Sequence, residues 1–163
     1  MHDLASFGLL DVLKKLIEAP PSEEGEDNNP AAEATMAVDI NTKDDRGCTP
    51  LIWAARNGHV DVVHYLCSHG GDVNTSSYGG MTPLHHSCNT ANESCVAKLL
   101  EDGADANQAD ECGNTSLHYA CSRGVLNIVV RLTEGGADVA ATNKAGSGMV
   151  RRKGDEGEEW GSL

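Results

Sequence analysis

The sequence predicts an all-α solenoid of stacked helix–turn–helix units with projecting β-hairpin loops. Two observations lead to this fold class: a pattern that returns every 33 residues, and a helix-start signal at the same place in each copy. A third supports it. Hydrophobic residues make up 39% of the chain but aromatic residues only 4%, so the core must consist of small aliphatic side chains, which suits closely packed helices. A length of 163 residues fits one domain.

The repeat is visible at several kinds of residue. Thr-Pro-Leu at 49–51 and 82–84 is in register with Thr-Ser-Leu at 115–117. The same spacing links glycines and aspartates, namely Gly47, Gly80, Gly113 and Gly146, then Gly70, Gly103 and Gly136, and Asp39, Asp72, Asp105 and Asp138. So many positions in register indicate one structural unit used repeatedly.

Each recurring residue has a physical task in that unit. The threonine is a good N-cap, and a proline after it suits the first helical position. Val62, Val63 and Leu66 then stand at helical spacing in a second helix. Gly70 and its equivalents suit the left-handed end of that helix. The Asp-Val-Asn segments and Asp-Asp-Arg-Gly turns that follow predict a hairpin.

The chain resembles the ankyrin-repeat family, whose Gly-x-Thr-Pro-Leu-His-x-Ala motif is matched most fully by residues 80–87. The resemblance covers roughly 3–18 and 38–146. Four positions depart from the motif: Ile52 replaces the histidine, Ser116 the proline, Ala91 the glycine between helices and Ala140 the hairpin asparagine. We expect each to weaken one unit slightly, and Ala91 most, because a residue with a Cβ is strained at positive φ.

The domain organisation follows from the register. We expect a repeat domain over 1–146, made of a partial repeat at 1–43, full repeats at 44–76, 77–109 and 110–142, and the start of a truncated fifth unit at 143–146. Ala5 and Gly8 match Ala55 and Gly58 at an offset of 50, which later falls to 33 and so indicates an insertion of 17 residues within 20–37. Its proline and acidic residues predict a disordered loop.

The segment after the repeats carries no Thr-Pro-Leu signal. Residues 147–163 are therefore predicted to be a disordered tail. In that case the outer face of the fourth unit would be uncovered, and we expect this unit to open before the middle of the stack.

Charge and cysteine content restrict the partners and the compartment. The formal net charge is −13, which argues against nucleic acid and anionic membrane and favours a protein partner with a basic surface. No apolar run reaches the roughly 20 residues that span a bilayer, and the start lacks a secretory signal. Six cysteines without a CxxC pair suggest reduced thiols. We expect a soluble cytoplasmic protein, with the nucleus as a second location.

Two kinds of chemistry were weighed and set aside. His85 with Cys88, and His118 with Cys121, stand three residues apart on a helix, but no tight four-ligand spacing supports a metal site. A cysteine enzyme would also need an activated thiolate and an oxyanion site, for which there is no motif. We expect the histidines to bond to the capping threonine or a neighbouring loop and the cysteines to be buried. No metal, cofactor or small-molecule substrate is predicted.

Stacked repeats create an extended concave surface whose exposed positions vary freely, so protein binding is the expected activity. The resemblance implies that contacts come from hairpin tips and the exposed end of each first helix. On this chain these positions are Asp45, Arg46, Cys48, Arg56, Asn57, Tyr78, Met81, Asn89, Thr90, Glu111, Asn114, Ser122 and Arg123. Arg56, Tyr78, Met81 and Arg123 are favoured, because aromatic, Met and Arg side chains often anchor interfaces.

Three function classes remain open. The first is an adaptor or inhibitor, similar in size to the small ankyrin inhibitors of cell-cycle kinases. The second is a regulatory ankyrin fragment of a larger enzyme or channel, which the end of the register after Gly146 suggests. The third, a cysteine or histidine enzyme, is a formal alternative.

A narrower hypothesis concerns modification. Leu66 and Leu99 stand eight residues before Asn74 and Asn107, which resembles the ankyrin pattern for asparagine β-hydroxylation. The favoured alternative is that these asparagines stabilise the hairpins by local hydrogen bonds.

Overall fold

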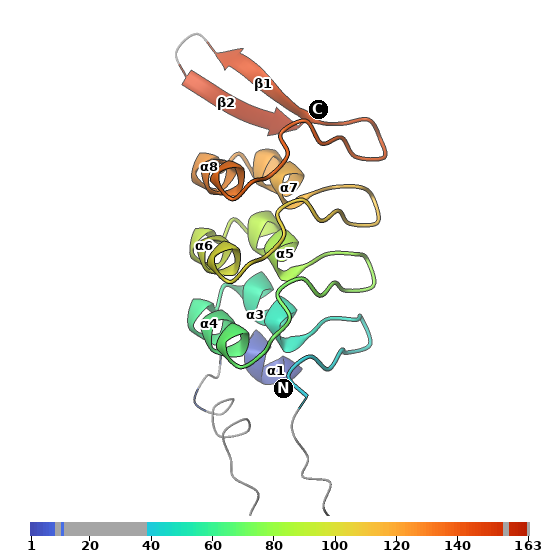
Figure 1. The fold of residues 1–163 in the computed structure, drawn as a ribbon, viewed down its shortest axis with the longest axis vertical. Coiled ribbons are helices and arrows are strands. Elements are labelled where there is room, and N and C mark those ends of the chain that lie inside the picture. Colours follow the sequence, from blue (N-terminus) through green and yellow to red (C-terminus); the bar gives the residue numbers. More distant parts are fainter. Residues whose placement is uncertain (9–10, 12–38, 155–156, 163) are drawn as a thin grey trace, which may run out of the picture.

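The computed structural model describes residues 1–8, 11, 39–154 and 157–162. Helices stack in pairs along one axis, and loops project from the stack on one side (Figure 1). The elements are α1 (His2–Ser6), α3 (Pro50–Asn57), α4 (Val60–Ser68), α5 (Pro83–Asn89), α6 (Glu93–Glu101), α7 (Ser116–Arg123), α8 (Leu126–Glu134), β1 (Met149–Gly154) and β2 (Gly157–Ser162). The predicted all-α solenoid is confirmed. The acidic insertion at 20–37 lies outside the described residues.

The first helix of each full unit begins at the predicted threonine. Thr49 and Thr82 have extended backbones, and their hydroxyls accept hydrogen bonds at 3.4 Å from the backbone N–H groups of Ile52 and His85. The His85 ring completes this cap. Its Nδ1 accepts from the Thr82 N–H at 3.1 Å, while its Nε2 faces the Asn114 carbonyl oxygen at 3.1 Å. The motif histidine therefore joins the helix start to the next unit.

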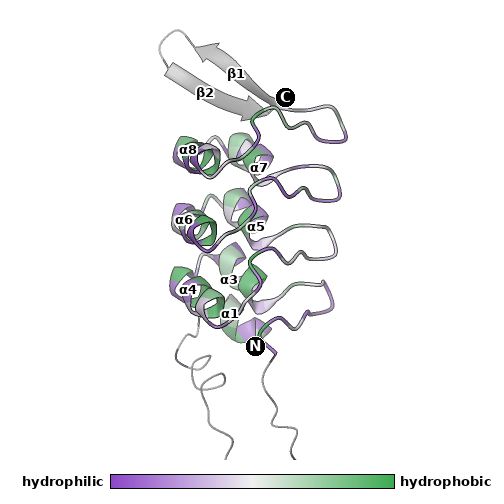
Figure 2. Ribbon diagram, viewed as in Figure 1, coloured by the Kyte–Doolittle hydropathy of each residue, from purple (hydrophilic) through white to green (hydrophobic). Residues whose placement is uncertain are grey.

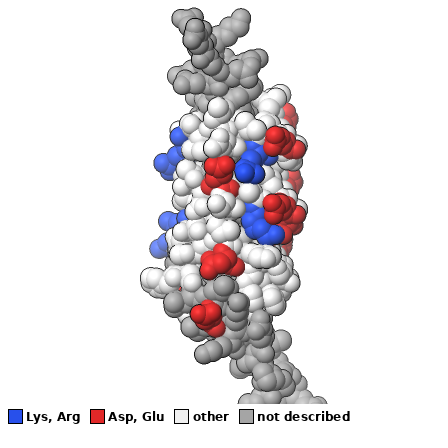
Figure 3. All heavy atoms as spheres, turned by 90° about the vertical axis from the view of Figure 1, so that its left-hand side faces the viewer, with Lys and Arg blue, Asp and Glu red and all other residues white. Residues whose placement is uncertain are grey.

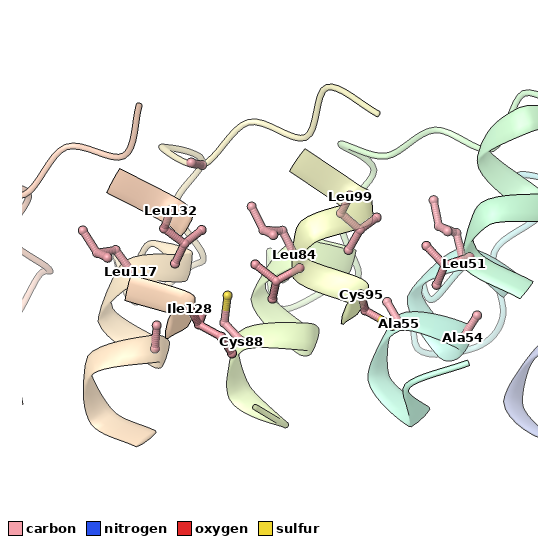
Figure 4. Close-up of a cluster of buried hydrophobic side chains, with 14 of the residues drawn as sticks. Leu51, Ala54, Ala55, Leu84, Cys88, Cys95, Leu99, Leu117, Ile128 and Leu132 are labelled. Atoms are coloured by element: carbon pink, nitrogen blue, oxygen red, sulfur yellow. The ribbon is translucent and has the colours of Figure 1, made fainter. Parts of the chain in front are cut away.

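The core runs through the whole stack as a series of leucines from both helices of each unit (Figure 4). These leucines are at most 1% exposed: Leu51, Leu84 and Leu117 from α3, α5 and α7, and Leu66, Leu99 and Leu132 from α4, α6 and α8. Small residues such as Ala54 and Cys88 lie between them. Hydrophobic residues concentrate on the helices and hydrophilic ones on the projecting loops (Figure 2). The small side chains let neighbouring helices pack closely.

Neighbouring hairpins are joined by a ladder of asparagine side chains. The amide of Asn107 donates to the Gly136 carbonyl oxygen at 2.9 Å, and its Oδ1 accepts from the Asp138 N–H at 2.7 Å. Asn74 and Asn41 make the same pair of bonds one and two units earlier, respectively. This ladder fixes the spacing of the hairpins and so the positions of their tips.

Two departures from the motif have visible consequences. Ala91 has φ 57°, the one positive φ outside glycine in the described part of the chain, and this is the conformation in which a residue with a Cβ is expected to be strained. Ser116, at the proline position of α7, has a buried hydroxyl without a hydrogen-bond partner. Both lie in units that keep the full helix pair.

The predicted disordered tail is corrected for the described part of 147–163. There β1 and β2 form an antiparallel hairpin, and β2 lies against α7 and α8 (Figure 1). The register pairs Arg152 with Glu159 and Lys153 with Glu158. The hairpin occupies the end of the stack.

Candidate partner-binding surface

The ends of α3, α5 and α7 present one continuous set of polar side chains, which we name the helix-end row. It consists of Arg56, Asn57, Asn89, Thr90, Ser122 and Arg123. All are exposed except Asn89, which is half-buried. Glycines with positive φ, Gly58 at 79° and Gly124 at 70°, end α3 and α7 directly after the row.

The two arginines of the helix-end row are held in place by neighbours. The Arg56 guanidinium lies over the Trp53 ring, 5.2 Å from its centroid. Arg123 donates to Asn89 Oδ1 from Nη2 at 2.8 Å and from Nε at 3.2 Å, bridging two units. Both side chains remain exposed. They are thus partly ordered cations on the surface, which reduces the entropy lost when a partner orders them further.

A second set of exposed side chains lies at the hairpin tips. Asp45, Arg46, Tyr78 and Glu111 are exposed, and Tyr78 is 68% exposed. The tips are joined by backbone hydrogen bonds, from Tyr78 N to Arg46 O at 3.1 Å and from Glu111 N to Gly79 O at 3.2 Å. A Cβ at Gly47 would lie only 2.7 Å from Tyr78 Cδ1, so this glycine allows the ring to approach the preceding tip.

Three predicted contact residues have a different environment. Cys48 is 6% exposed, so its side chain is not part of the surface and we remove it from the set. Met81 and Asn114, at the same repeat position, are half-buried. The Asn114 amide accepts from Asn143 Nδ2 at 2.8 Å and donates to Asp110 Oδ2 at 3.3 Å. Asn114 therefore supports the hairpin stem more than it faces a partner.

Between the two sets lies a row of ring side chains, Trp53, His86 and Tyr119. Trp53 Nε1 donates to Asp44 Oδ2 at 2.8 Å, and the Tyr119 hydroxyl donates to Asp110 Oδ2 at 2.6 Å. In the middle unit Ser77 stands at the position of these aspartates.

The middle ring, His86, lacks that partner. Its Nε2 is buried and makes no hydrogen bond. Burial, followed by the positive charges of Arg56 and His85, lowers the pKa of His86 to about 4, so the imidazole is neutral near pH 7. The scaffold therefore leaves one ring in the row without the carboxylate that its two neighbours have.

Charge is distributed unevenly between the two layers of helices. No Asp or Glu occurs in α3, α5 or α7, which carry Arg56 and Arg123. Of the outer helices, α6 and α8 carry both signs and α4 carries Asp61, and Figure 3 shows their face with basic and acidic residues side by side. On it Arg131 Nε lies 3.4 Å from Glu93 Oε1, and Lys98 Nζ 3.0 Å from Asp102 Oδ1. In the part of the chain that the structure describes, neither arginine of the helix-end row forms an ion pair with a carboxylate.

Two exposed residues that the sequence analysis did not select extend these surfaces. Phe7, directly after α1, is 73% exposed. The offset of 50 residues equates it with Asn57, so the register already contained this information. Lys144, also exposed, is the fourth tip residue, and its N–H donates to the Cys112 carbonyl oxygen at 3.0 Å. Phe7 was missed because it lies before the first full repeat.

The cysteine and histidine residues considered for catalysis are part of the core. Cys88 and Cys121 are buried. Burial raises the pKa of the Cys88 thiol, and it raises that of Cys121 to about 11, whereas a nucleophile requires a thiolate. Among the described residues, no group of three or more His, Cys, Asp and Glu is placed to hold a metal ion. No helix in the same residues is long and apolar enough to cross a membrane.

Asn74 and Asn107, the candidates for hydroxylation, are exposed residues whose amides are used in the hairpin ladder. This supports their structural role. Hydroxylation stays a prediction, and mass spectrometry of the native protein without an added oxygen on either asparagine would remove it.

A comparison with protein-family models agrees with this geometry. The model described as ankyrin repeats (3 copies) matches residues 1–110 and 79–143. These matches include every unit that contributes to the helix-end row and the tips from Asp45 to Glu111.

Proposed function

We propose that this chain, which belongs to the ankyrin-repeat family, binds a protein partner through the helix-end row and the hairpin tips. Ankyrin repeats are generally modules for protein–protein interaction. The observation that supports this surface most is its construction: exposed side chains recur at a spacing of 33 residues on a backbone whose own hydrogen bonds are made within the stack. Side chains with no structural task can contribute to recognition.

The anchors that we propose are Arg56, Tyr78 and Arg123. Tyr78 offers a large ring at a tip with little loss of conformational freedom, since the ring already rests against Gly47. Arginine and tyrosine are enriched among residues that dominate interface energies. Half-buried Met81, below Tyr78, and the neutral residues Asn57, Asn89, Thr90 and Ser122 would complete the contact.

The hairpin tips suggest the charge of the partner surface that would contact them. The tips carry Asp45 and Glu111 beside Arg46 and Lys144, so the basic surface expected from the net charge of −13 would contact these two carboxylates. The role that we propose is that of an adaptor or inhibitor in the cytoplasm or nucleus, where the six free cysteines would stay reduced. The same surface would serve a regulatory domain of a larger protein.

Site-specific photo-cross-linking in cells tests this proposal. A photoreactive phenylalanine analogue replaces Tyr78 or Thr90, and a matched control replaces His64, which is exposed on the outer helix α4. We expect the same protein to be cross-linked from positions 78 and 90 and not from 64. Cross-linking from position 64 alone would place the interface on the outer helices and contradict the proposal.

Binding of the purified partner then tests the anchors. We expect Tyr78→Ala and Arg123→Ala each to weaken affinity by at least about fivefold, since anchor residues commonly contribute more than roughly 1 kcal/mol. Helicity by circular dichroism should be unchanged. Unaltered affinity in both variants would show that the site lies elsewhere.

A further inference from the structure

We infer that the helix-end row binds an acidic segment of the partner in extended form, with carboxylates on Arg56 and Arg123. This inference rests on the proposed function and specifies the chemistry of the partner at that surface. It differs from the expectation of a basic partner, which derives from the charge of the whole chain and applies to the tips.

The distribution of charge is the first argument. The chain has 25 acidic residues against 12 basic ones, yet α3, α5 and α7 and the turns that follow them contain none of the 25. Arg131 on the outer face has Glu93 beside it, whereas Arg56 contacts a ring and Arg123 a neutral amide. The two cations of the row therefore keep their charge unpaired within the described structure, and guanidinium groups bind carboxylates in a bidentate manner.

The middle unit supplies the second argument. Asp44 and Asp110 provide carboxylates to Trp53 and Tyr119, but Ser77 replaces the aspartate beside His86. The Ser77 hydroxyl donates to the Met81 carbonyl oxygen at 3.3 Å, and His86 Nε2 is buried without a hydrogen-bond partner. A carboxylate of the partner, bound beside Arg56, would give the middle unit the acidic group that Asp44 and Asp110 provide in the two flanking units.

The net negative charge of the protein does not prevent this contact at physiological salt. Charges farther than a Debye length of about 8 Å are largely screened at 0.15 M. On the outer helices, acidic residues lie beside basic ones (Figure 3). Local contacts at the arginines should therefore decide the affinity.

The spacing of the arginines sets the length of the acidic segment. Neighbouring helices pack roughly 9 Å apart, so Arg56 in α3 and Arg123 in α7, with α5 between them, are on the order of 20 Å apart. An extended chain advances ~3.3 Å per residue. Two acidic residues about six positions apart would thus reach both arginines.

Fluorescence anisotropy at 0.15 M salt tests the inference with defined peptides. The probe is a fluorescein-labelled Gly/Ser peptide with two pairs of glutamates about six residues apart, and its analogue carries lysines instead. We expect the glutamate peptide to bind and the lysine peptide not to bind. Arg56→Glu and Arg123→Glu should each weaken binding roughly twofold to tenfold, because charge reversal removes one exposed ion pair and adds a repulsion at the same place. Arg131→Glu, the same change on α8, should leave it unchanged.

A double variant tests the role of the middle unit, and it should weaken peptide binding without destabilising the fold. Ser77→Asp with His86→Tyr reproduces the Asp110–Tyr119 pair in the middle unit. We expect a higher Tm, because an unpartnered buried group is removed, and weaker binding of the glutamate peptide, because a carboxylate of the chain now occupies the site. A higher Tm with unchanged affinity would contradict the role of the middle unit.

The remaining outcomes separate this inference from the proposed function. Cross-linking of a partner at Tyr78 and Thr90 without binding of the glutamate peptide up to about 1 mM would leave the proposed function in place and overturn the acidic segment. Preference for the lysine peptide would also overturn it. The glutamate peptide could also bind more strongly after Glu23, Glu24, Glu26 and Asp27 are changed to amides. That result would show that the chain's own acidic insertion, and not a partner, occupies the helix-end row, and it would overturn the inference.

Discussion

Asp110 organises the turn that leads into α7. Its carboxylate accepts hydrogen bonds from the backbone N–H groups of Cys112 and Asn114, each at 2.8 Å, and from the Tyr119 hydroxyl at 2.6 Å. Burial alone would raise the pKa of Asp110, but these donors outweigh it and hold the pKa below the usual 3.8. An aspartate with a depressed pKa stabilises the fold above that range and loses the effect as the pH falls through it.

Tyr119→Phe removes one of these donors. We expect it to lower the free energy of unfolding by about 1–2 kcal/mol at pH 7, the range for a hydrogen bond to a charged group. The loss should shrink as the pH falls below the ordinary aspartate pKa of about 3.9 and through the lower pKa of Asp110 in the folded protein, because the protonated carboxyl no longer accepts a hydrogen bond as an anion. Urea unfolding at several pH values measures this, and Tyr78→Phe, at an exposed tyrosine, is the control. A loss that does not vary with pH would contradict the assignment.

Ala91 is the second residue with a measurable cost. A left-handed conformation costs a residue with a Cβ about 1–2 kcal/mol, while glycine adds a smaller entropic cost. We expect Ala91→Gly to raise the free energy of unfolding by about 0.5–1 kcal/mol. Ala97→Gly, inside α6, should lower it by about 1 kcal/mol. Equal destabilisation in both variants would show that the φ of 57° is not a source of strain.

At the scale of elements, the hairpin ladder couples neighbouring units. Asn107→Ala removes the bonds to the Gly136 carbonyl oxygen and the Asp138 N–H. We expect a loss of about 1–2 kcal/mol from two hydrogen bonds at an exposed position, with faster exchange of the Asp138 amide. Asn127→Ala, on α8, removes one hydrogen bond of 3.3 Å to Glu93 on α6 and should cost less than about 0.5 kcal/mol. Equal effects would mean that the ladder does not couple the units.

Helix positions could be predicted from the sequence because local signals determine them. Thr49, Thr82 and Thr115 carry the start signal, and the glycines of the repeat mark the turns. The C-terminal hairpin could not be predicted, because the 33-residue pattern does not extend into it and its contacts with α7 and α8 form only in the folded chain. The exposure of individual side chains within a hairpin could not be predicted from the sequence either. Cys48 is buried and Tyr78, in the next hairpin, is exposed. The direction of each side chain there depends on how the hairpins pack.

The candidate surface was predictable only in part for the same reason. The register identified the helix ends, and most of those residues are exposed. It could not reveal that Asn114 is used by Asp110 and Asn143, nor that His86 lacks a partner, because these facts involve residues from different units. Such contacts arise only when the units stack.

At the scale of the whole molecule, stability should depend on how the ends are covered. β2 lies against α7 and α8, and Leu117 and Leu132 in these helices are buried. In a stack whose units contact only neighbours, removing a covering element weakens the adjacent unit first. We expect deletion of residues 149–163 to speed hydrogen exchange in α7 and α8 well before α3 to α6, and to promote self-association.

The intact chain is the comparison for this deletion. With the hairpin present, protection in α7 and α8 should approach that in α5 and α6. Identical exchange in the intact and shortened chains would show that the hairpin does not act as a cap.

The most direct test of the central claim is to map the bound partner on this chain by hydrogen exchange of the complex. We predict slower exchange at the hairpin tips around Asp45, Tyr78 and Glu111 and at the ends of α3, α5 and α7, with α4, α6 and α8 unchanged. Protection confined to the outer helices, with the tips and helix ends unaffected, would contradict the account.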